Sequence, residues 1–233
     1  MAVDALFTLA IPLALLRPEL PFLGAGFSSL VGPIAAYLSA SLVPVLYLAL
    51  SLRRARQLNA VTALAGGGAL LSGALALWPL SGLAFAVRDS SGSLLLLTVA
   101  TVSLLIRRPL FAAILRVALL PGTPERAARL KELLGRPEVW RATMNATRAL
   151  QLKALAVAGT NIAVKHALVT APFGTEAFNA QLAAASALMI PVAYLASALG
   201  YGTATWLTRR GLRRAFGHAV PLWGHRFWAA LET

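Results

Sequence analysis

Long apolar stretches separated by short polar ones dominate the chain. Six of them are rich in Ala, Leu and Gly and lack the alternation of a half-buried strand, at residues 3–16, 26–52, 59–80, 90–106, 148–170 and 178–208. About 20 apolar residues in a helix cross a hydrocarbon core of about 30 Å, and a backbone in lipid must satisfy its own hydrogen bonds. The pattern therefore predicts an all-α, polytopic integral membrane protein with six transmembrane helices, forming a single membrane domain over residues 1–233.

The start of the fourth stretch depends on two charges. This span would begin near Leu83 if Arg88 and Asp89 were tolerated inside the bilayer. Burying either charge there costs a few kcal/mol, so we expect both residues in an extracellular loop.

Composition supports the membrane class and removes several kinds of chemistry. Hydrophobic residues make up 58% of the chain and charged residues only 12%, against about 45–50% and about 25% in soluble domains. The chain has no Cys, which excludes disulfides, thiolate metal sites and thiol nucleophiles. No basic residue precedes the first apolar stretch, so we expect a retained first helix and not a cleaved signal peptide.

The positions of Lys and Arg predict the orientation. Of the 21 basic residues, all but Arg17, Arg88 and Lys165 lie in three segments, residues 52–58, 107–153 and 209–233. The positive-inside rule places these segments in the cytoplasm, and six spans with both termini inside achieve this. The net charge of +13 is then a topogenic signal and a surface for anionic lipid headgroups, and no nucleic acid is expected as a partner.

Residues 107–147 form the one large segment between predicted spans. An apolar run after Pro109 is followed by "TPERAARLKELLG", in which Thr123 can cap a helix that ends at Gly135. Leucines share one face of this second helix. We expect a cytoplasmic amphipathic insertion lying on the membrane surface, the alternative being a solvated connector.

The basic, aromatic tail at residues 209–233 has the same character, with Phe216, Trp223, Phe227 and Trp228 suited to headgroup depth. Basic residues at the borders of the spans are the expected lipid headgroup contacts: Arg107, Arg108, Arg209, Arg210, Arg213 and Arg214. Close helix packing is also indicated, because Ala65, Ala69 and Gly73 in the third span and Ala196, Gly200 and Ala204 in the sixth recur every four residues.

The fifth span carries unusual polar residues. Asn161 lies about 3 Å and Lys165 about 9 Å from its midpoint at 1.5 Å per residue, so Lys165 can snorkel to the outer interface with Glu176 or Asp89 as its acidic partner. Asn161 should face another helix or water. These side chains either pair structurally or line a water-filled or ligand-binding cavity. The candidate residues of this polar stripe and of the adjoining start of the sixth span are Arg148, Gln151, Asn161, Lys165, His166, Glu176 and Asn179.

No motif predicts catalysis. The chain contains no HExxH, no Walker-type glycine loop, no GxSxG and no paired carboxylates within a span, and it has three histidines and eight acidic residues in all. We therefore expect a protein that is not an enzyme and that has neither a metal site nor a cofactor.

One segment resembles a known family. "RDSSGSLLLLTVATVSLLIRRPLF", residues 88–111, is similar to the centre of the small bacterial inner-membrane proteins related to intracellular septation protein A, in which a span ends in a basic pair followed by Pro and an apolar residue. The matching residues are Ser103, Arg107, Arg108, Pro109 and Leu110, and "LRRARQLNAVTALAGGG" resembles the second and third spans of that family. The resemblance covers about the first half of the chain. It implies the bacterial inner membrane and supplies no catalytic residues.

Two functions follow from these observations. The first is a non-enzymatic membrane protein of the cell envelope that supports septation or envelope assembly through contacts with lipids, with envelope or division proteins, or with further copies of itself. The second is a small transporter or channel that uses the polar stripe of the fifth span. The two differ in whether Lys165 faces a cavity or the lipid border.

Overall fold

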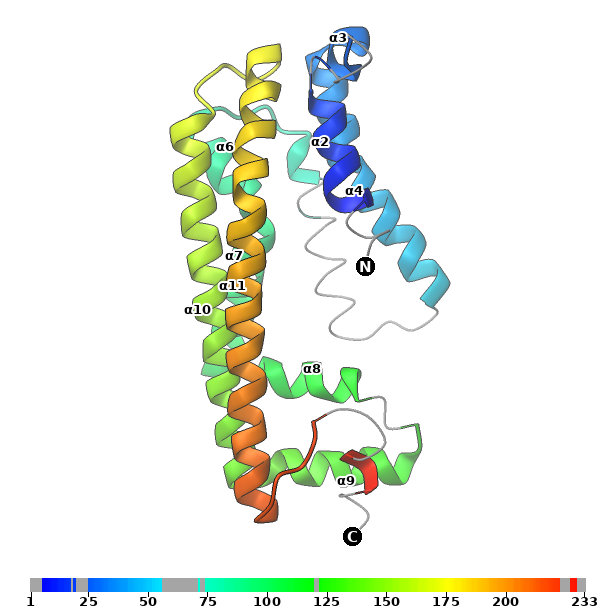
Figure 1. The fold of residues 1–233 in the computed structure, drawn as a ribbon, viewed down its shortest axis with the longest axis vertical. Helices are drawn as coiled ribbons and strands as arrows, with labels where there is room; N and C mark the ends of the chain where they lie inside the picture. The colour runs from blue at the N-terminus through cyan, green and yellow to red at the C-terminus, as the bar shows by residue number, and fades with distance from the viewer. Residues whose placement is uncertain are drawn as a thin grey trace. The chain divides into compact units, whose positions relative to one another are not determined.

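The computed structural model describes residues 6–17, 19, 25–55, 71, 74–119, 122–222 and 227–229, and within them the fold is all-α, as predicted (Figure 1). A short π-helix, η1 (Leu6–Ala10), leads directly into α2 (Ile11–Leu16). The remaining helices are α3 (Phe27–Val31), α4 (Pro33–Ala55), α6 (Gly82–Asp89), α7 (Ser91–Leu105), α8 (Leu110–Ala118), α9 (Pro124–Gly135), α10 (Pro137–Leu168) and α11 (Glu176–Phe216).

These helices form two compact units. Unit 1 comprises the described residues within 1–58, 62–95 and 156–194, and unit 2 comprises those within 96–155 and 195–233. Each unit has a hydrophobic core of its own.

The core of unit 1 is aromatic. Phe178 of α11 makes edge-to-face contacts with Tyr37 of α4, Phe85 of α6 and Phe173, with ring centroids 4.9–5.9 Å apart. Such pairs stabilise a core by about 0.5–1.5 kcal/mol each beyond their buried area. The rings therefore join the helices that surround the polar residues of this unit.

Unit 2 buries the apolar faces of α8 and α9 against α10 and α11. Figure 1 shows α8 and α9 as two short helices running crosswise to the two long ones. Phe111 and Leu115 of α8 and Leu130, Leu133 and Leu134 of α9 are all buried in one core. The leucine face that was expected to lie on the membrane surface is thus covered by protein. The sequence does not separate these two cases, because an amphipathic helix has the same leucine pattern whether it packs on lipid or on protein.

The tail aromatics receive the same correction. Phe227 and Trp228 are buried in the protein core of unit 2, while Trp223 lies outside the described residues. The cap and end predicted for α9 are confirmed: the Arg126 N–H donates to Thr123 Oγ1, and the helix ends at Gly135.

The "S…RRPL" motif is a helix-to-helix junction. After α7, Arg107 adopts φ 55°, and the amides of Arg107 and Arg108 donate to the carbonyls of Leu104 and Ser103, which is the Schellman pattern. The first amides of α8 find side-chain acceptors, Leu110 N–H on Ser103 Oγ and Phe111 N–H on Thr147 Oγ1. These bonds satisfy donors that a helix start leaves open and fix α8 to α7 and α10.

The described residues do not contain six long apolar helices. In the described part of the chain, α11 alone is long and apolar enough to cross a membrane, and α6 with α7 counts as a second if their 59° bend lies within one span. The second predicted span is divided at Gly32 into α3 and α4, and all but the last two residues of the fifth lie within the longer, more polar α10. Most of the third span, with its Ala65, Ala69 and Gly73 repeat, lies outside the described residues.

The small residues of α11 allow close approach to α10 within unit 2. A Cβ at Gly200 would lie 2.8 Å from Lys153 Cβ, and one at Gly211 would lie 3.1 Å from the Glu138 carbonyl oxygen and overlap Ala142 Cβ. The packing role predicted for Gly200 is confirmed. Gly211 makes a second close approach, and part of what it faces there is backbone, which cannot move aside.

Gly211→Ala should therefore destabilise the protein by about 1–3 kcal/mol, the usual cost of overpacking. Gly202→Ala is the matched control on the same helix, because nothing lies within 4 Å of its added methyl group. It should be neutral or stabilising by up to about 1 kcal/mol through helix propensity. Thermal unfolding followed by circular dichroism measures both, and equal midpoints for the two variants would contradict this packing.

Candidate functional site

Three charged residues of unit 1, Arg88, Asp89 and Lys165, gather where α6 meets α7. The two helices are bent by 59° at Ser90, and Arg88 and Asp89 form the last turn of α6. Both residues were expected in a loop, and this expectation is wrong: they are helical, and Arg88 is 7% exposed. Buried charge is tolerated here because each group has partners.

Arg88 is held by two oxygens and two rings. Its guanidinium donates to the Trp78 carbonyl and to the Tyr37 hydroxyl. Its Cζ atom lies 5.0 Å from the centroid of Phe85 and 5.6 Å from that of Tyr37, which are cation–π distances. The aromatic core of unit 1 therefore forms the wall against which this cation rests.

Asp89 pairs with Lys165 of α10. Lys165 Nζ donates to Asp89 Oδ2, and Asn161 one turn earlier donates to Ser90 Oγ at 2.9 Å and, more weakly, to the same Asp89 oxygen at 3.4 Å. Asp89 was one of the two predicted partners of Lys165. Snorkelling is not observed, because Lys165 is 6% exposed and its charge is neutralised inside the unit.

A cavity of about 300 Å³ adjoins this pair. It is lined by Tyr37, Ser41, Pro44, Val45, Ala76, Arg88 and Asp89. Among the described residues, both donors that reach the carboxylate bind Oδ2, and the Asp89 side chain remains 25% exposed. The cavity thus presents a cation, a partly accessible anion and two hydroxyl groups within an otherwise apolar lining.

The other residues of the predicted stripe do not join this cluster. In unit 2, Gln151 donates to Thr101 Oγ1 at 2.8 Å, and Arg148 is exposed and bonds to Asn145 on its own helix. His166 and Glu176 are exposed.

Asn179 is fully buried in unit 1. Its Nδ2 donates to Ser28 Oγ and to the Pro33 carbonyl, whereas its Oδ1 has no partner in the described part of the chain. The amide therefore holds the junction of α3 and α4 against the first turns of α11.

All six predicted lipid-contact arginines are exposed: Arg107, Arg108, Arg209, Arg210, Arg213 and Arg214. Three of these, Arg209, Arg210 and Arg213, line a second cavity in unit 2. No cluster of three carboxylate or imidazole side chains that would hold a metal ion occurs within the described ranges.

Sequence reasoning missed Tyr37 and Ser41 as parts of the site. Nothing in their local pattern separates them from other small or aromatic residues of an apolar helix. The signal that was present is the Arg88–Asp89 pair between two apolar runs, since charges there require partners from elsewhere in the chain.

Comparison of the chain with protein-family models, with curated proteins and with solved structures finds no match. The resemblance to the septation-related family therefore stays an expectation based on residues 88–111.

Lys165→Met should destabilise the protein by about 1–3 kcal/mol, because it leaves the partly exposed Asp89 carboxylate without its counter-ion. Asp89→Asn combined with Lys165→Met should recover part of this loss, with a coupling energy of about 0.5–3 kcal/mol. Arg148→Met removes a charge from the exposed side of the same helix and should change stability by less than about 0.5 kcal/mol. A double-mutant cycle from chemical unfolding measures the coupling, and a coupling near zero would show that the pair does not stabilise unit 1.

Proposed function

We propose that this chain is a non-enzymatic integral membrane protein of the bacterial inner membrane that binds a small polar solute beside Asp89 and moves it across the bilayer. The observation that carries the proposal is the Arg88–Asp89–Lys165 cluster next to a cavity at the bend between α6 and α7. Ionisable groups inside apolar helix bundles are costly and commonly mark transport pathways.

The exposed surface of the long helices supports a location in lipid. Only 22% of the most apolar window of α11 is buried, whereas the core helix of a soluble protein would be mostly covered. Large apolar side chains are also exposed on neighbouring turns of other helices, among them Leu42, Leu46, Leu152 and Leu155. Apolar surface of this extent requires lipid or protein to cover it.

The charges of the cavity favour a solute that carries both signs. A simple anion would meet the Asp89 carboxylate, and a simple cation would meet the Arg88 guanidinium. A zwitterion can direct its cationic group to Asp89 and its carboxylate to Arg88 and the hydroxyls of Tyr37 and Ser41. A volume of about 300 Å³ is at the small end of ligand pockets and suits an amino-acid-sized molecule.

The bend between α6 and α7 supports movement as well as binding. Discontinuous helices position substrate groups near the midplane in many transporters, where half-helices can rock against the rest of the fold. A cationic group arriving at Asp89 would compete with Lys165 for the same carboxylate. In this proposal, exchange of partners at Asp89 couples solute binding to release of α10 from the α6–α7 bend.

A role in septation or envelope assembly is the second candidate, and it depends on the similarity of residues 88–111 to the septation-related proteins. It needs no solute. Variants of the cluster that keep the fold would then leave any flux unchanged while altering cell division.

Uptake into proteoliposomes tests the proposal. Liposomes containing the full chain should accumulate members of a radiolabelled amino-acid mixture, and Asp89→Asn should lower the initial rate about tenfold or more, since a charge-assisted hydrogen bond to the solute contributes about 1.5–3 kcal/mol. Glu132→Gln makes the same carboxylate-to-amide change at an exposed position of α9 and should leave the rate unchanged.

Folded protein in each preparation is checked by circular dichroism. Uptake no greater than in empty liposomes, or equal rates for the two variants, would contradict the proposal.

A further inference from the structure

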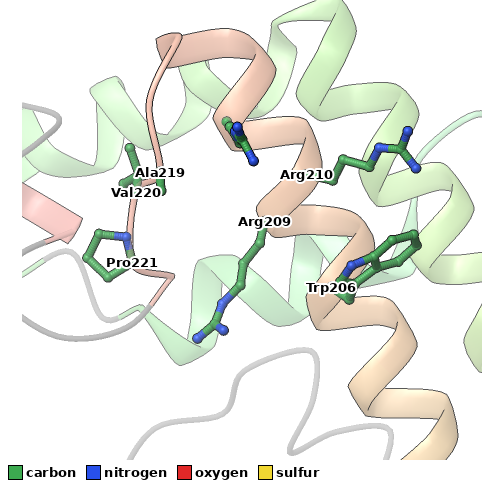
Figure 2. A pocket seen from close by; sticks show the side chains of 7 residues that line it. Trp206, Arg209, Arg210, Ala219, Val220 and Pro221 are labelled. Carbon is green, nitrogen blue, oxygen red and sulfur yellow. The ribbon is translucent and has the colours of Figure 1, made fainter.

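The second cavity, in unit 2, lies beside the last turns of α11 and has a volume of about 760 Å³. Its helical wall consists of Trp206, Arg209, Arg210 and Arg213, which repeat at spacings of three and four and so share one face. Ala219, Val220 and Pro221 form the other wall. Figure 2 shows Arg209 extending from α11 toward the side of Pro221, whereas Arg210 extends on the side of Trp206.

The charge in this cavity is of one sign. Three guanidinium groups line it, and none of the described residues that line it carries a carboxylate. Among the residues that the structure describes, none of these arginines has an acidic partner within salt-bridge distance. Arg210 instead rests on the Trp206 ring, with 5.6 Å between its Cζ atom and the ring centroid. A cavity with three guanidinium groups and no counter-ion attracts a multiply charged anion.

Guanidinium chemistry selects among anions. Arginine presents planar, paired N–H donors that match the oxygens of phosphate and carboxylate groups. With several arginines along the cavity, the ligand group that uses the most donors is a phosphate, because it offers more acceptor oxygens and more charge than a carboxylate.

Apolar surface continues from the arginines along the same helix. Leu195, Leu199 and Trp206 lie on a common face at spacings of four and seven, and they are 63%, 63% and 56% exposed. Val220, on the opposite wall, is buried and adds an apolar contact. A ligand with a phosphate at one end and hydrocarbon at the other would fit both parts.

We propose that this cavity binds a phosphate group through Arg209 and Arg213, with Arg210 and Trp206 at its edge. Two sources share this chemistry: the headgroup of an anionic phospholipid and free phosphate. The apolar face favours the lipid. Only this lipid source rests on the membrane location proposed above, and the site is separate from the cavity beside Asp89.

Calorimetric titration of the purified full chain in detergent tests the site with three probes. These are phosphatidic acid, diacylglycerol with the same acyl chains, and inorganic phosphate. Phosphatidic acid should bind, and diacylglycerol, which lacks the phosphate, should bind at least about tenfold more weakly because it forms none of the charge-assisted bonds. Saturable binding of inorganic phosphate of similar strength would identify free phosphate as the source.

Variants locate the binding. Arg209→Gln with Arg213→Gln should weaken binding of the phosphate probe about tenfold or more, since each charge-assisted bond contributes at least that factor. Arg116→Gln with Arg141→Gln is the matched control: it removes two exposed arginines of unit 2 that do not line the cavity and that were not expected to contact headgroups.

A control that binds as weakly as the cavity variant would mean diffuse surface charge and would overturn the site. So would the absence of binding by both phosphate probes, or equal binding of phosphatidic acid and diacylglycerol. None of these results bears on uptake through the Asp89 cavity, so the two proposals fail separately.

Discussion

A charged side chain inside a protein requires a partner, and unit 1 is arranged around three such side chains. Removing a charge from water costs several kcal/mol, and an opposite charge or oriented oxygens must offset that cost. Arg88, Asp89 and Lys165 are contributed by the end of α6 and by α10. The oxygens that accept hydrogen bonds from Arg88 belong to the Tyr37 hydroxyl and the Trp78 carbonyl. The positions of four chain segments are thus linked to one small group of charges.

Because these contacts meet at Asp89, a change at this one carboxylate can alter several of them. Among the described residues, Lys165 and Asn161 hydrogen-bond to Asp89 and Ser90 at the bend, and the Asp89 carboxylate borders the cavity. An event that alters the charge or partners of Asp89 therefore acts directly on the contact of α10 with the bend. The aromatic rings around Arg88 hold the other side of the cluster in place.

Local signals in the sequence predicted local structure well. The stretch at 90–106 corresponds to α7, and the Thr123 cap, the Gly135 end and the Gly200 contact all depend on neighbours in sequence or on one helix face. The partners of the apolar faces were not predictable in this way. The leucines of α9 have the same pattern whether they cover protein or lipid, and only the tertiary structure shows that they cover protein.

The site illustrates the same limit. Asn161 and Lys165 stood out because polar residues are rare in apolar helices, and Asp89 was a candidate partner for its charge. Tyr37 and Ser41 are more than forty positions away from Asp89 in sequence and carry no local signal, so no pattern could place them at the cavity.

Water access at α4 tests the central claim most directly, and the absence of cysteine makes the measurement simple. Ser41→Cys places a thiol at the cavity, and Leu46→Cys places one on the 60% exposed apolar surface of the same helix. With the protein in membranes, a charged, membrane-impermeant thiol reagent should modify the first and leave the second unmodified, because the proposed function requires lipid over Leu46 and water in the cavity. Rapid modification of both would place the apolar surface in water and contradict the membrane location. Modification of neither would mean that the Asp89 cavity is closed to solutes.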